Sequence, residues 1–297
     1  MKGDAPIGVI GLGLMGAALS ARLIDAGIAV TGFDIDAARC RALKDNGGEL
    51  AVTSAGLAAT CRIIVVAVYS AEQVEAVLAE LERSDNLAHK IMICATTCAP
   101  AEIMRIAGRA EVAGLPLIEA PISGTSTEVR DGSATALIAG APEAIDKATA
   151  ILDILCPQRV QIGKIGDASR TKLAINLILQ NNRAALAEGI AFAEALGLDA
   201  ANFLAAARRS AAYSCVMDTK GHKMLTRDFT PQSHISQTLK DAELILAEAR
   251  QRNLRLPMTS AQTELLRAAI ALQGPDSDSS AIIEAIRLSP GGIGETK

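Results

Sequence analysis

Aromatic side chains are scarce in this 297-residue chain, which has no tryptophan, two tyrosines and four phenylalanines. Its core must therefore consist of aliphatic residues, which the 50% hydrophobic content can supply. Few aromatic rings remain for stacking on bases, no basic tract occurs, and the net charge is −4. These deficits argue against a nucleic-acid-binding protein.

Long apolar runs and paired cysteines are also missing. The longest uninterrupted apolar run, residues 63–69, is far too short to span a bilayer, so no membrane partner is expected. The six cysteines form no CxxC pair and have no histidine nearby at zinc-ligand spacing, so no metal is expected. Scattered cysteines of this kind are typical of reduced thiols, which predicts a cytoplasmic protein.

A glycine-rich turn between two apolar runs stands near the N-terminus. The run 7–10 predicts a buried strand, and Gly11-Leu-Gly13-Leu-Met-Gly16 follows it directly. An Ala- and Leu-rich helical stretch and a second apolar run ending in Asp34 come next. Strand, glycine turn, helix and strand in this order are the context that makes GxGxxG a dinucleotide-binding signature.

Each glycine of the turn has a physical role. Gly11 permits the tight turn, Gly13 lets a pyrophosphate approach the backbone, and Gly16 lets the helix pack close to the strand. The helix N-terminus offers N–H groups to the phosphates. Asp34 suits the two ribose hydroxyls and would repel a 2′-phosphate, which favours NAD(H) over NADP(H). The predicted cofactor residues in this segment are Gly11, Gly13, Leu14, Met15, Gly16 and Asp34.

Strands and helices alternate as far as residue 165. Further strands are predicted at 63–69, 91–95, 115–120 and 133–138, and helices at 37–46, 71–83, 101–113 and 142–155. The alternation predicts an α/β Rossmann-type fold with a doubly wound parallel sheet. Ligands of such sheets bind outside the carboxyl ends of the strands, and Val68 lies at one of these ends in the predicted cofactor site.

After residue 166 the pattern becomes helical. An apolar-periodic stretch at 168–196 is followed by helical patterns at 199–210, 212–221, 232–252, 257–273 and 279–286. The chain is therefore expected to consist of a Rossmann domain, residues 1–165, and an all-helical C-terminal domain, residues 166–297. This second domain carries more apolar helix than it can readily bury alone, which predicts a homo-oligomer.

Lys172 and Asn176 lie four residues apart at the start of the long helical stretch, so they share one helix face. Their neighbours are largely apolar. A lysine on a buried face can have a lowered pKa and serve as a proton donor or acceptor. The alternative is a solvated lysine on the outer face of the helix, and position alone does not decide between the two.

Five motifs, taken in order, resemble those of the β-hydroxyacid dehydrogenase family: GVIGLGLMG, ATTCAP, EAPISG, GDASRTKLAIN and LKDAELILAEA. That family includes 3-hydroxyisobutyrate dehydrogenases and tartronate semialdehyde reductases, and 6-phosphogluconate dehydrogenase is its larger relative. The resemblance covers nearly the whole chain. It implies reversible, NAD(P)-dependent oxidation of a small β-hydroxy acid to an aldehyde or ketone, by a homodimer or homotetramer.

The resemblance also implies roles for individual residues. Lys172 matches the catalytic lysine and Asn176 the asparagine one turn later. The loop of Ser123, Gly124 and Thr125 matches the one that binds the substrate carboxylate. Thr96 or Thr97 matches the loop beside the nicotinamide, and Lys240 matches a lysine that reaches substrate and cofactor.

The chain departs from the family pattern in its substrate loop. Two glycines of the usual SGGxxGA pattern are replaced by bulkier polar residues, which predicts a different substrate pocket. Arg130 in this loop could pair locally with Glu128 or Asp131, or could meet a second acidic group of the substrate. Two other functions are compatible with the fold: an imine or keto-reductase of the same superfamily, and a non-catalytic NAD(H)-binding sensor.

Overall fold

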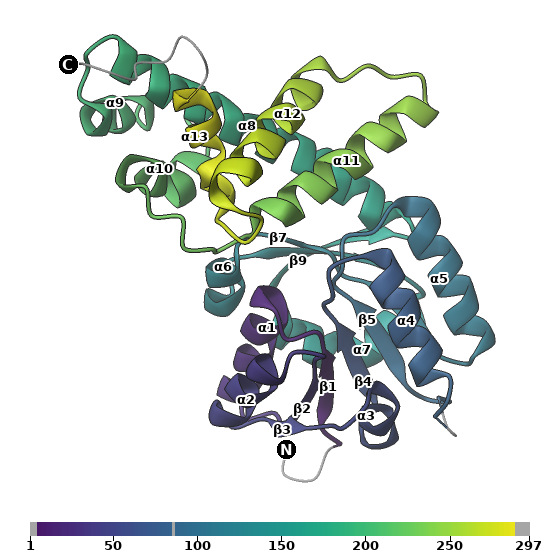
Figure 1. The fold of residues 1–297 in the computed structure, drawn as a ribbon. Coiled ribbons are helices and arrows are strands. Elements are labelled where there is room, and N and C mark those ends of the chain that lie inside the picture. Colours follow the sequence, from purple (N-terminus) through teal and green to yellow (C-terminus); the bar gives the residue numbers. More distant parts are fainter. Residues whose placement is uncertain (1–4, 85–86, 289–297) are drawn as a thin grey trace. The chain divides into compact units, whose positions relative to one another are not determined.

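The computed structural model describes residues 5–84 and 87–288. It divides into two compact units, Met1–Lys172 and Leu173–Lys297. The first unit contains the sheet, and the second is helical (Figure 1).

The sheet of the first unit has the strand order β3-β2-β1-β4-β5-β6-β8-β7, with β9 paired to β8. The pairs that join β1 through β6 are all parallel, as predicted for a Rossmann-type unit. The strands are β1 (Ile7–Ile10), β2 (Val30–Phe33), β3 (Glu49–Leu50), β4 (Ile63–Val66), β5 (Ile91–Cys94), β6 (Leu117–Glu119), β7 (Ile122–Ser123), β8 (Thr135–Ala139) and β9 (Gln158–Gly163).

One edge of the sheet departs from the predicted parallel arrangement. Strand β8 runs antiparallel to β6, and β7 runs antiparallel to β8. Neighbouring antiparallel strands need only a short connection, whereas a parallel pair needs a crossover of a dozen residues or more. The short helix α6 (Ser126–Asp131) joins β7 to β8, which is too little chain for a full crossover helix. The sheet is therefore parallel-dominant, with a mixed edge that follows the predicted substrate loop.

Helices cover both faces of the sheet. One apolar cluster joins alternate strand residues to α1 (Leu14–Asp25) and α7 (Pro142–Leu155). A second joins the intervening residues to α3 (Ser54–Thr60), α4 (Ala71–Leu81) and α5 (Pro100–Val112). In β4, Val65 belongs to the first cluster, and Ile64 and Val66 belong to the second. This two-sided burial explains why the strand sequence shows no polar alternation.

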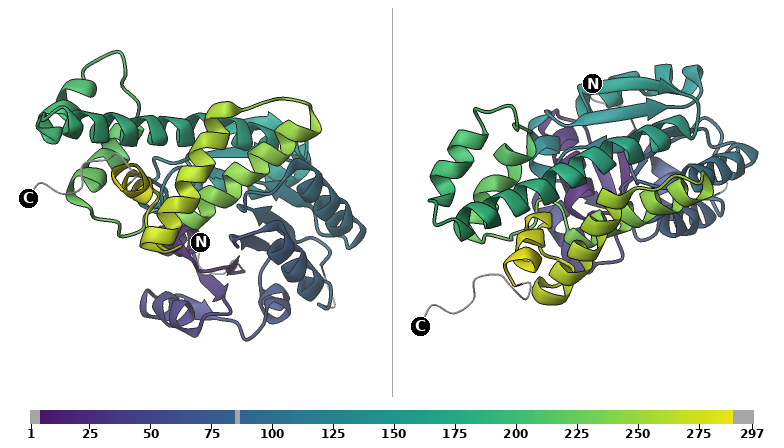
Figure 2. Two further views of the ribbon diagram at one scale, coloured as in Figure 1. Left: turned by 45° about the horizontal axis from the view of Figure 1, so that its top comes forward. Right: turned by 90° about the horizontal axis from the view of Figure 1, so that it is seen from above.

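The second unit contains most of α8 (Asp167–Ala195), then α9 (Ala200–Ala207), α10 (Val216–Thr226), α11 (Ile235–Gln251), α12 (Pro257–Gln273), a 3₁₀ turn (Ser279–Ala281) and α13 (Ile282–Arg287). Helices α11 and α12 lie side by side (Figure 2). Helix α10 begins later than the predicted 212–221, and the turn before it contains a hydrogen bond from Ala212 N to Ser210 Oγ at 3.1 Å. None of the helices within 5–84 and 87–288 has the length and apolar character needed to cross a membrane.

Candidate active site

The first and third glycines of the predicted dinucleotide turn are required by the fold itself. Gly11 has a φ of +87°, and a Cβ there would lie 2.6 Å from the carbonyl oxygen of Ala67. A Cβ on Gly16 would lie 1.8 Å from the carbonyl oxygen of Gly11. Both positions therefore exclude any side chain, because the backbone on the other side of the turn occupies the space.

Gly13 differs from these two glycines. The heavy atom nearest to a Cβ built on Gly13 is Nη1 of Arg39, at 3.8 Å, so the protein leaves room for a side chain. Helix α1 begins at the next residue, and Gly13 provides no side-chain cap. The exposed N–H groups of a helix start form an anion site. The turn thus fits a pyrophosphate, whose close approach a side chain at position 13 would obstruct. Leu14 and Met15, the first residues of α1, are half-buried beside it.

Asp34 is fixed by backbone groups before any ligand binds. Its Oδ2 accepts from Leu12 N at 2.6 Å, and its Oδ1 accepts from Asp36 N at 2.8 Å. Arg39 Nη1 lies 3.5 Å from the same carboxylate, whose side chain is only 4% exposed. The carboxylate therefore joins the glycine turn to the end of β2, where a ribose ring of a dinucleotide would meet it.

Val68 and Thr96, both predicted to lie at the cofactor, contact each other. Thr96 Oγ1 accepts from Val68 N at 3.1 Å and donates to Val68 O at 3.0 Å. The hydroxyl thus ties together the loops that follow β4 and β5. Thr96 is buried, so its side chain acts by fixing the shape of these loops.

In the predicted substrate loop, Ser123 ends β7 and is half-buried. Gly124 has a φ of +151°, and a Cβ there would lie 2.8 Å from the Cβ of Ala134. Thr125 caps α6: its Oγ1 accepts from Glu128 N at 3.2 Å, and Glu128 Oε2 accepts from Thr125 N at 2.7 Å. The segment that lacks the family's glycines therefore folds into a capped helix, which the sequence interpretation did not predict.

Arg130 pairs with neither of the acidic residues that the sequence suggested. Its Nη2 lies 3.0 Å from Oδ2 of Asp25 on α1, and both side chains are more than half exposed. Arg22 of the same helix donates to the carbonyl oxygen of Arg130 at 3.0 Å. Arg130 therefore helps to attach α6 to α1.

Lys172 and Asn176 lie on one face of α8 and are 4% and 5% exposed. This burial excludes the interpretation of Lys172 as a solvated residue on the outer face. The Lys172 side chain is therefore withdrawn from solvent, as a residue of a binding site would be.

In the helical unit, Asp241 contacts two predicted site residues. Its Oδ2 accepts from Asn176 Nδ2 at 2.9 Å, and its Oδ1 lies 3.1 Å from Lys240 Nζ as an ion pair. Asp241 is buried. Because the amide nitrogen of Asn176 donates to Asp241, the amide oxygen is left to accept a hydrogen bond from another donor.

Two family models match the chain. Residues 6–163 match the NAD binding domain of 6-phosphogluconate dehydrogenase. Residues 166–286 match the model described as NAD-binding of NADP-dependent 3-hydroxyisobutyrate dehydrogenase. The chain belongs to the β-hydroxyacid dehydrogenase family.

Known relatives match the dehydrogenase over nearly its whole length. It is 29% identical over 280 residues to the L-threonate dehydrogenase of Cupriavidus necator, covering 93% of this chain and 94% of that protein. It is 28% identical over 286 residues to the 2-hydroxy-3-oxopropionate reductase of Escherichia coli, covering 95% and 97%. A solved 3-hydroxyisobutyrate dehydrogenase from Salmonella typhimurium superposes with a TM-score of 0.87 at 24% identity, covering 95% and 99%.

These matches confirm the predicted family, the Rossmann-type fold followed by helices, and an NAD(P)-dependent oxidoreductase. All six cysteines carry free thiols. Among the described residues, no three His, Cys, Asp or Glu side chains gather in an arrangement that could hold a metal ion.

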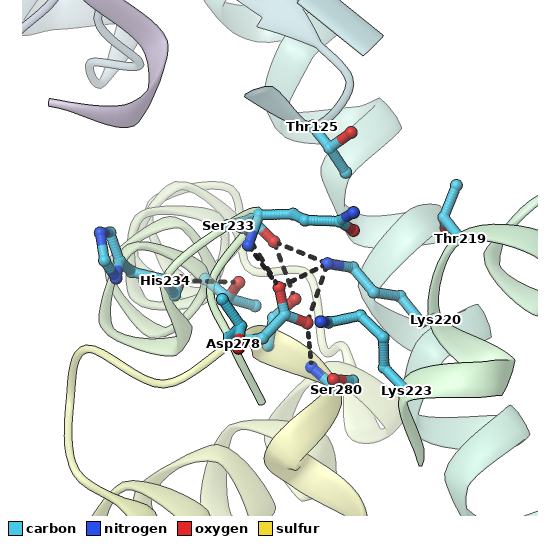
Figure 3. A network of polar contacts seen from close by, with 12 residues as sticks. Thr125, Thr219, Lys220, Lys223, Ser233, His234, Asp278 and Ser280 are labelled. Atoms are coloured by element: carbon cyan, nitrogen blue, oxygen red, sulfur yellow. Dashed lines mark hydrogen bonds and ion pairs between the residues drawn. The ribbon is translucent and has the colours of Figure 1, made fainter. Parts of the chain in front are cut away.

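A buried ion pair in the helical unit of the dehydrogenase escaped sequence analysis. Lys220 Nζ donates to both carboxylate oxygens of Asp278, at 2.9 and 2.8 Å, and the side chains are 2% and 0% exposed (Figure 3). Asp278 also accepts from Gln232 N and Ser280 N, each at 2.9 Å. The sequence Asp278-Ser-Ser marks a helix cap, but nothing in it identifies a lysine 58 residues away as the partner.

The pair carries opposing electrostatic effects. Burial lowers the pKa of Lys220 to about 8, although the Asp278 carboxylate opposes this shift. Burial alone would raise the pKa of Asp278, but the Lys220 ammonium and the backbone N–H groups hold it below its ordinary value. The pair therefore remains charged near neutral pH and fixes the loop before α11 and the 3₁₀ turn before α13.

Proposed function

We propose that this dehydrogenase reversibly oxidises a small β-hydroxy acid to the corresponding semialdehyde or keto acid, with Lys172 as general acid–base. The observation that carries the proposal is the burial of the Lys172 ammonium on the same helix face as Asn176. An acid–base group works best when its pKa lies near the working pH, and desolvation moves a lysine in that direction.

Each proposed residue has a defined task. In oxidation Lys172 accepts the proton of the substrate hydroxyl, and in reduction its ammonium returns a proton to the same oxygen. The oxygen of the Asn176 amide accepts from the lysine or from the substrate hydroxyl, since its nitrogen is engaged by Asp241. Ser123, Gly124 and Thr125 hold the substrate carboxylate.

The nicotinamide cofactor, when bound, accepts or supplies the hydride. Its phosphates are assigned to the glycine turn and the start of α1, and its nicotinamide to the loops that Val68 and Thr96 tie together. We propose NAD(H) as the preferred form, because the Asp34 carboxylate at the end of β2 suits two ribose hydroxyls. The ratio of kcat/KM for NADH and NADPH tests this preference, and a ratio below one would contradict it.

The proposed acid–base role is tested with Lys172→Ala and Lys172→Arg. We expect Lys172→Ala to lose about 10²–10⁴ of kcat, the usual contribution of a positioned acid–base group, while NADH binding is retained. The Arg variant keeps the charge but does not exchange a proton, so it should not restore turnover. NADH binding, measured by fluorescence titration, is the control for folding. Full activity of Lys172→Ala would refute the assignment.

The substrate class is tested by NAD⁺ reduction with 3-hydroxyisobutyrate, glycerate, threonate, 3-hydroxypropionate and 4-hydroxybutyrate. Turnover of at least one acid that disappears in Lys172→Ala supports the proposal. NADH binding without turnover of any acid would indicate a sensor. Reduction of cyclic imines without oxidation of any acid would indicate an imine reductase.

We also propose that the protein assembles through its helical unit into a homodimer or homotetramer in the cytoplasm and binds no nucleic acid. On α8, Ile178 and Phe192 are 60% and 65% exposed on a face opposite the buried residues, and Leu196, which directly follows the helix, is 59% exposed. An apolar stripe of this kind is typical of a covered surface. Light scattering after size exclusion measures the oligomeric state directly, and a monomer at micromolar concentration would contradict the proposal.

A further inference from the structure

The buried face of α8 is polar over its first turns. Five polar residues at helical spacing lie on this face and are all buried, namely Ser169, Lys172, Asn176, Gln180 and Arg183. Farther along the helix the same face becomes apolar at Leu186, Ala187 and Ile190. Burying polar side chains costs free energy unless each has a hydrogen-bond partner. The partners of these residues therefore show what holds the first turns of α8 in place.

The partner one turn before Lys172 is Glu119, at the end of β6. Its Oε2 accepts from Ser169 N at 2.8 Å and from Ser169 Oγ at 3.1 Å. Its Oε1 accepts from Gly166 N. The carboxylate is 1% exposed, and three donors from the start of α8 surround it.

This contact is a helix cap supplied by a distant strand. The first N–H groups of a helix have no partner within it, and a carboxylate there is also favoured by the helix dipole. Burial raises the pKa of Glu119, and the bonds from Gly166 and Ser169 only partly oppose this. Through these hydrogen bonds the buried Glu119 carboxylate holds the start of α8 against the end of β6.

The cap explains the sequence that precedes Lys172. Gly166 has a φ of +94°, which lets its N–H point to Glu119 and which L side chains rarely adopt. Asp167 pairs with Arg170 at 2.7 Å, on the solvent side of the same turn. Ser169 supplies two of the three donors, and Lys172 follows three residues later on the same face.

Glu119 also precedes the predicted substrate loop. Only Ala120, Pro121 and Ile122 separate it from Ser123. Its backbone is held on both sides of the strand, by pairing to Cys94 of β5 and to Ala139 of β8. The same residue therefore fixes one end of the substrate loop through its backbone and the start of the lysine helix through its carboxylate.

We propose that Glu119 is a positioning residue, which sets the distance between the Ser123 loop and Lys172 by capping α8 through Gly166 and Ser169. The inference rests on the proposed function of Lys172. It predicts that loss of the cap displaces the ammonium from the reacting oxygen while cofactor binding at the glycine turn is kept. A misplacement of about 1 Å at an acid–base group can cost on the order of 10²-fold in rate.

The test compares Glu119→Gln and Ser169→Ala with Thr53→Val. Thr53 caps α3 by accepting from Gly56 N at 3.0 Å, so its loss removes a helix cap in the same unit at a helix without any proposed site residue. The rate is measured with the panel acid of highest kcat/KM and is divided by the number of NADH-binding sites from titration. This ratio does not change when a variant merely lowers the folded fraction.

We expect Glu119→Gln to lower kcat per site about 10- to 100-fold, with KM for the acid and Kd for NADH changed by less than about threefold. Ser169→Ala removes one of the three hydrogen bonds and should lower kcat about 3- to 10-fold. Thr53→Val should leave kcat per site unchanged. Hydrogen exchange of residues 164–172 should accelerate in Glu119→Gln, because glutamine has one acceptor oxygen where the carboxylate has two, so either the Gly166 or the Ser169 amide loses its acceptor.

Unchanged kcat per site in Glu119→Gln would overturn the inference, and so would an increase in KM with unchanged kcat. If Glu119→Gln does not fold, Ser169→Ala decides by the same criterion. A wrong assignment of Lys172 gives a different result from a wrong assignment of Glu119. In the first case Lys172→Ala would remain active, whatever the activity of Glu119→Gln.

Discussion

The two units bury polar side chains in different ways. In the Rossmann unit, Asp34, Thr96 and Glu119 each accept from a backbone N–H of a loop or a helix start. In the helical unit, Lys220 and Asn176 donate to the side-chain carboxylates of Asp278 and Asp241. In these examples the Rossmann unit relies mainly on backbone donors, whereas in the helical unit each buried carboxylate also has a side-chain donor from a distant helix.

The difference determines what a single substitution leaves behind. Removing an acceptor in the Rossmann unit leaves a neutral N–H without a partner, which costs about 1–3 kcal/mol. Removing one member of a buried ion pair leaves an uncompensated charge, which costs about 3–5 kcal/mol. The helical unit should therefore be the more sensitive of the two to loss of one buried polar side chain.

The largest effect is expected for Lys220→Met, which leaves the Asp278 carboxylate buried without its cation. Asp278 keeps the bonds from Gln232 N and Ser280 N, but these donors are neutral. We expect the free energy of unfolding, measured in urea by circular dichroism, to fall by about 3–5 kcal/mol.

The control for this variant is Arg267→Ala. Arg267 pairs with Glu243 at 2.9 Å and Glu264 at 2.6 Å, and all three side chains are about half exposed or more. Its loss should cost less than about 1 kcal/mol. If Lys220→Met and Arg267→Ala lowered the free energy of unfolding equally, burial would not make an ion pair more important for stability.

The same distinction explains how much the sequence predicts. The glycine turn, the buried strands and Asp34 depend on local patterns, since residue spacing decides which groups meet within one βαβ unit. The sequence predicts that Lys172 lies at a helix start. It does not predict that the side chain is buried, because the identity of a residue does not reveal which distant residues pack on it. The pairs of Lys220 with Asp278 and Asn176 with Asp241 join residues 58 and 65 positions apart, and no local pattern specifies them.

Some missed elements did have a local signal. Thr125 and Glu128 form a capping box, Thr-x-x-Glu, which can be read from the sequence as a helix start. The glycine pattern of the family predicts neither α6 nor the antiparallel direction of β8. Strand β3 has only two residues, both exposed, and gives no periodic pattern.

A smaller effect is expected at the glycine turn, where Gly13→Ala and Gly16→Ala form a matched pair. Gly16→Ala forces a Cβ against the Gly11 carbonyl oxygen and should cost about 1–3 kcal/mol of stability. Gly13→Ala meets only Arg39 Nη1 at 3.8 Å, so stability should change by less than about 0.5 kcal/mol. NADH binding to Gly13→Ala should still weaken about tenfold, about 1.4 kcal/mol.

Thermal unfolding and NADH titration of the two variants separate a glycine needed by the fold from a glycine needed by the ligand. Gly13→Ala with undiminished NADH affinity would show that the phosphates do not approach this position. Gly16→Ala with unchanged stability would show that the backbone of the turn can move apart.

The smallest effect is expected for Thr125→Val, which removes a cap that binds backbone in the Rossmann unit. The Oγ1 of Thr125 accepts from Glu128 N at 3.2 Å and donates to Glu128 Oε2 at 2.9 Å. Its loss should cost about 1 kcal/mol, the typical value for a cap, and so less than half the cost of Lys220→Met. Thr125→Ser keeps the hydroxyl and should restore this stability.

If the hydroxyl also binds the substrate, Thr125→Val should raise KM for the acid and Thr125→Ser should not. A change in stability with no change in KM would limit Thr125 to the cap and leave the carboxylate to Ser123 and Gly124, because the one hydrogen that the Thr125 hydroxyl can donate is already given to Glu128 Oε2.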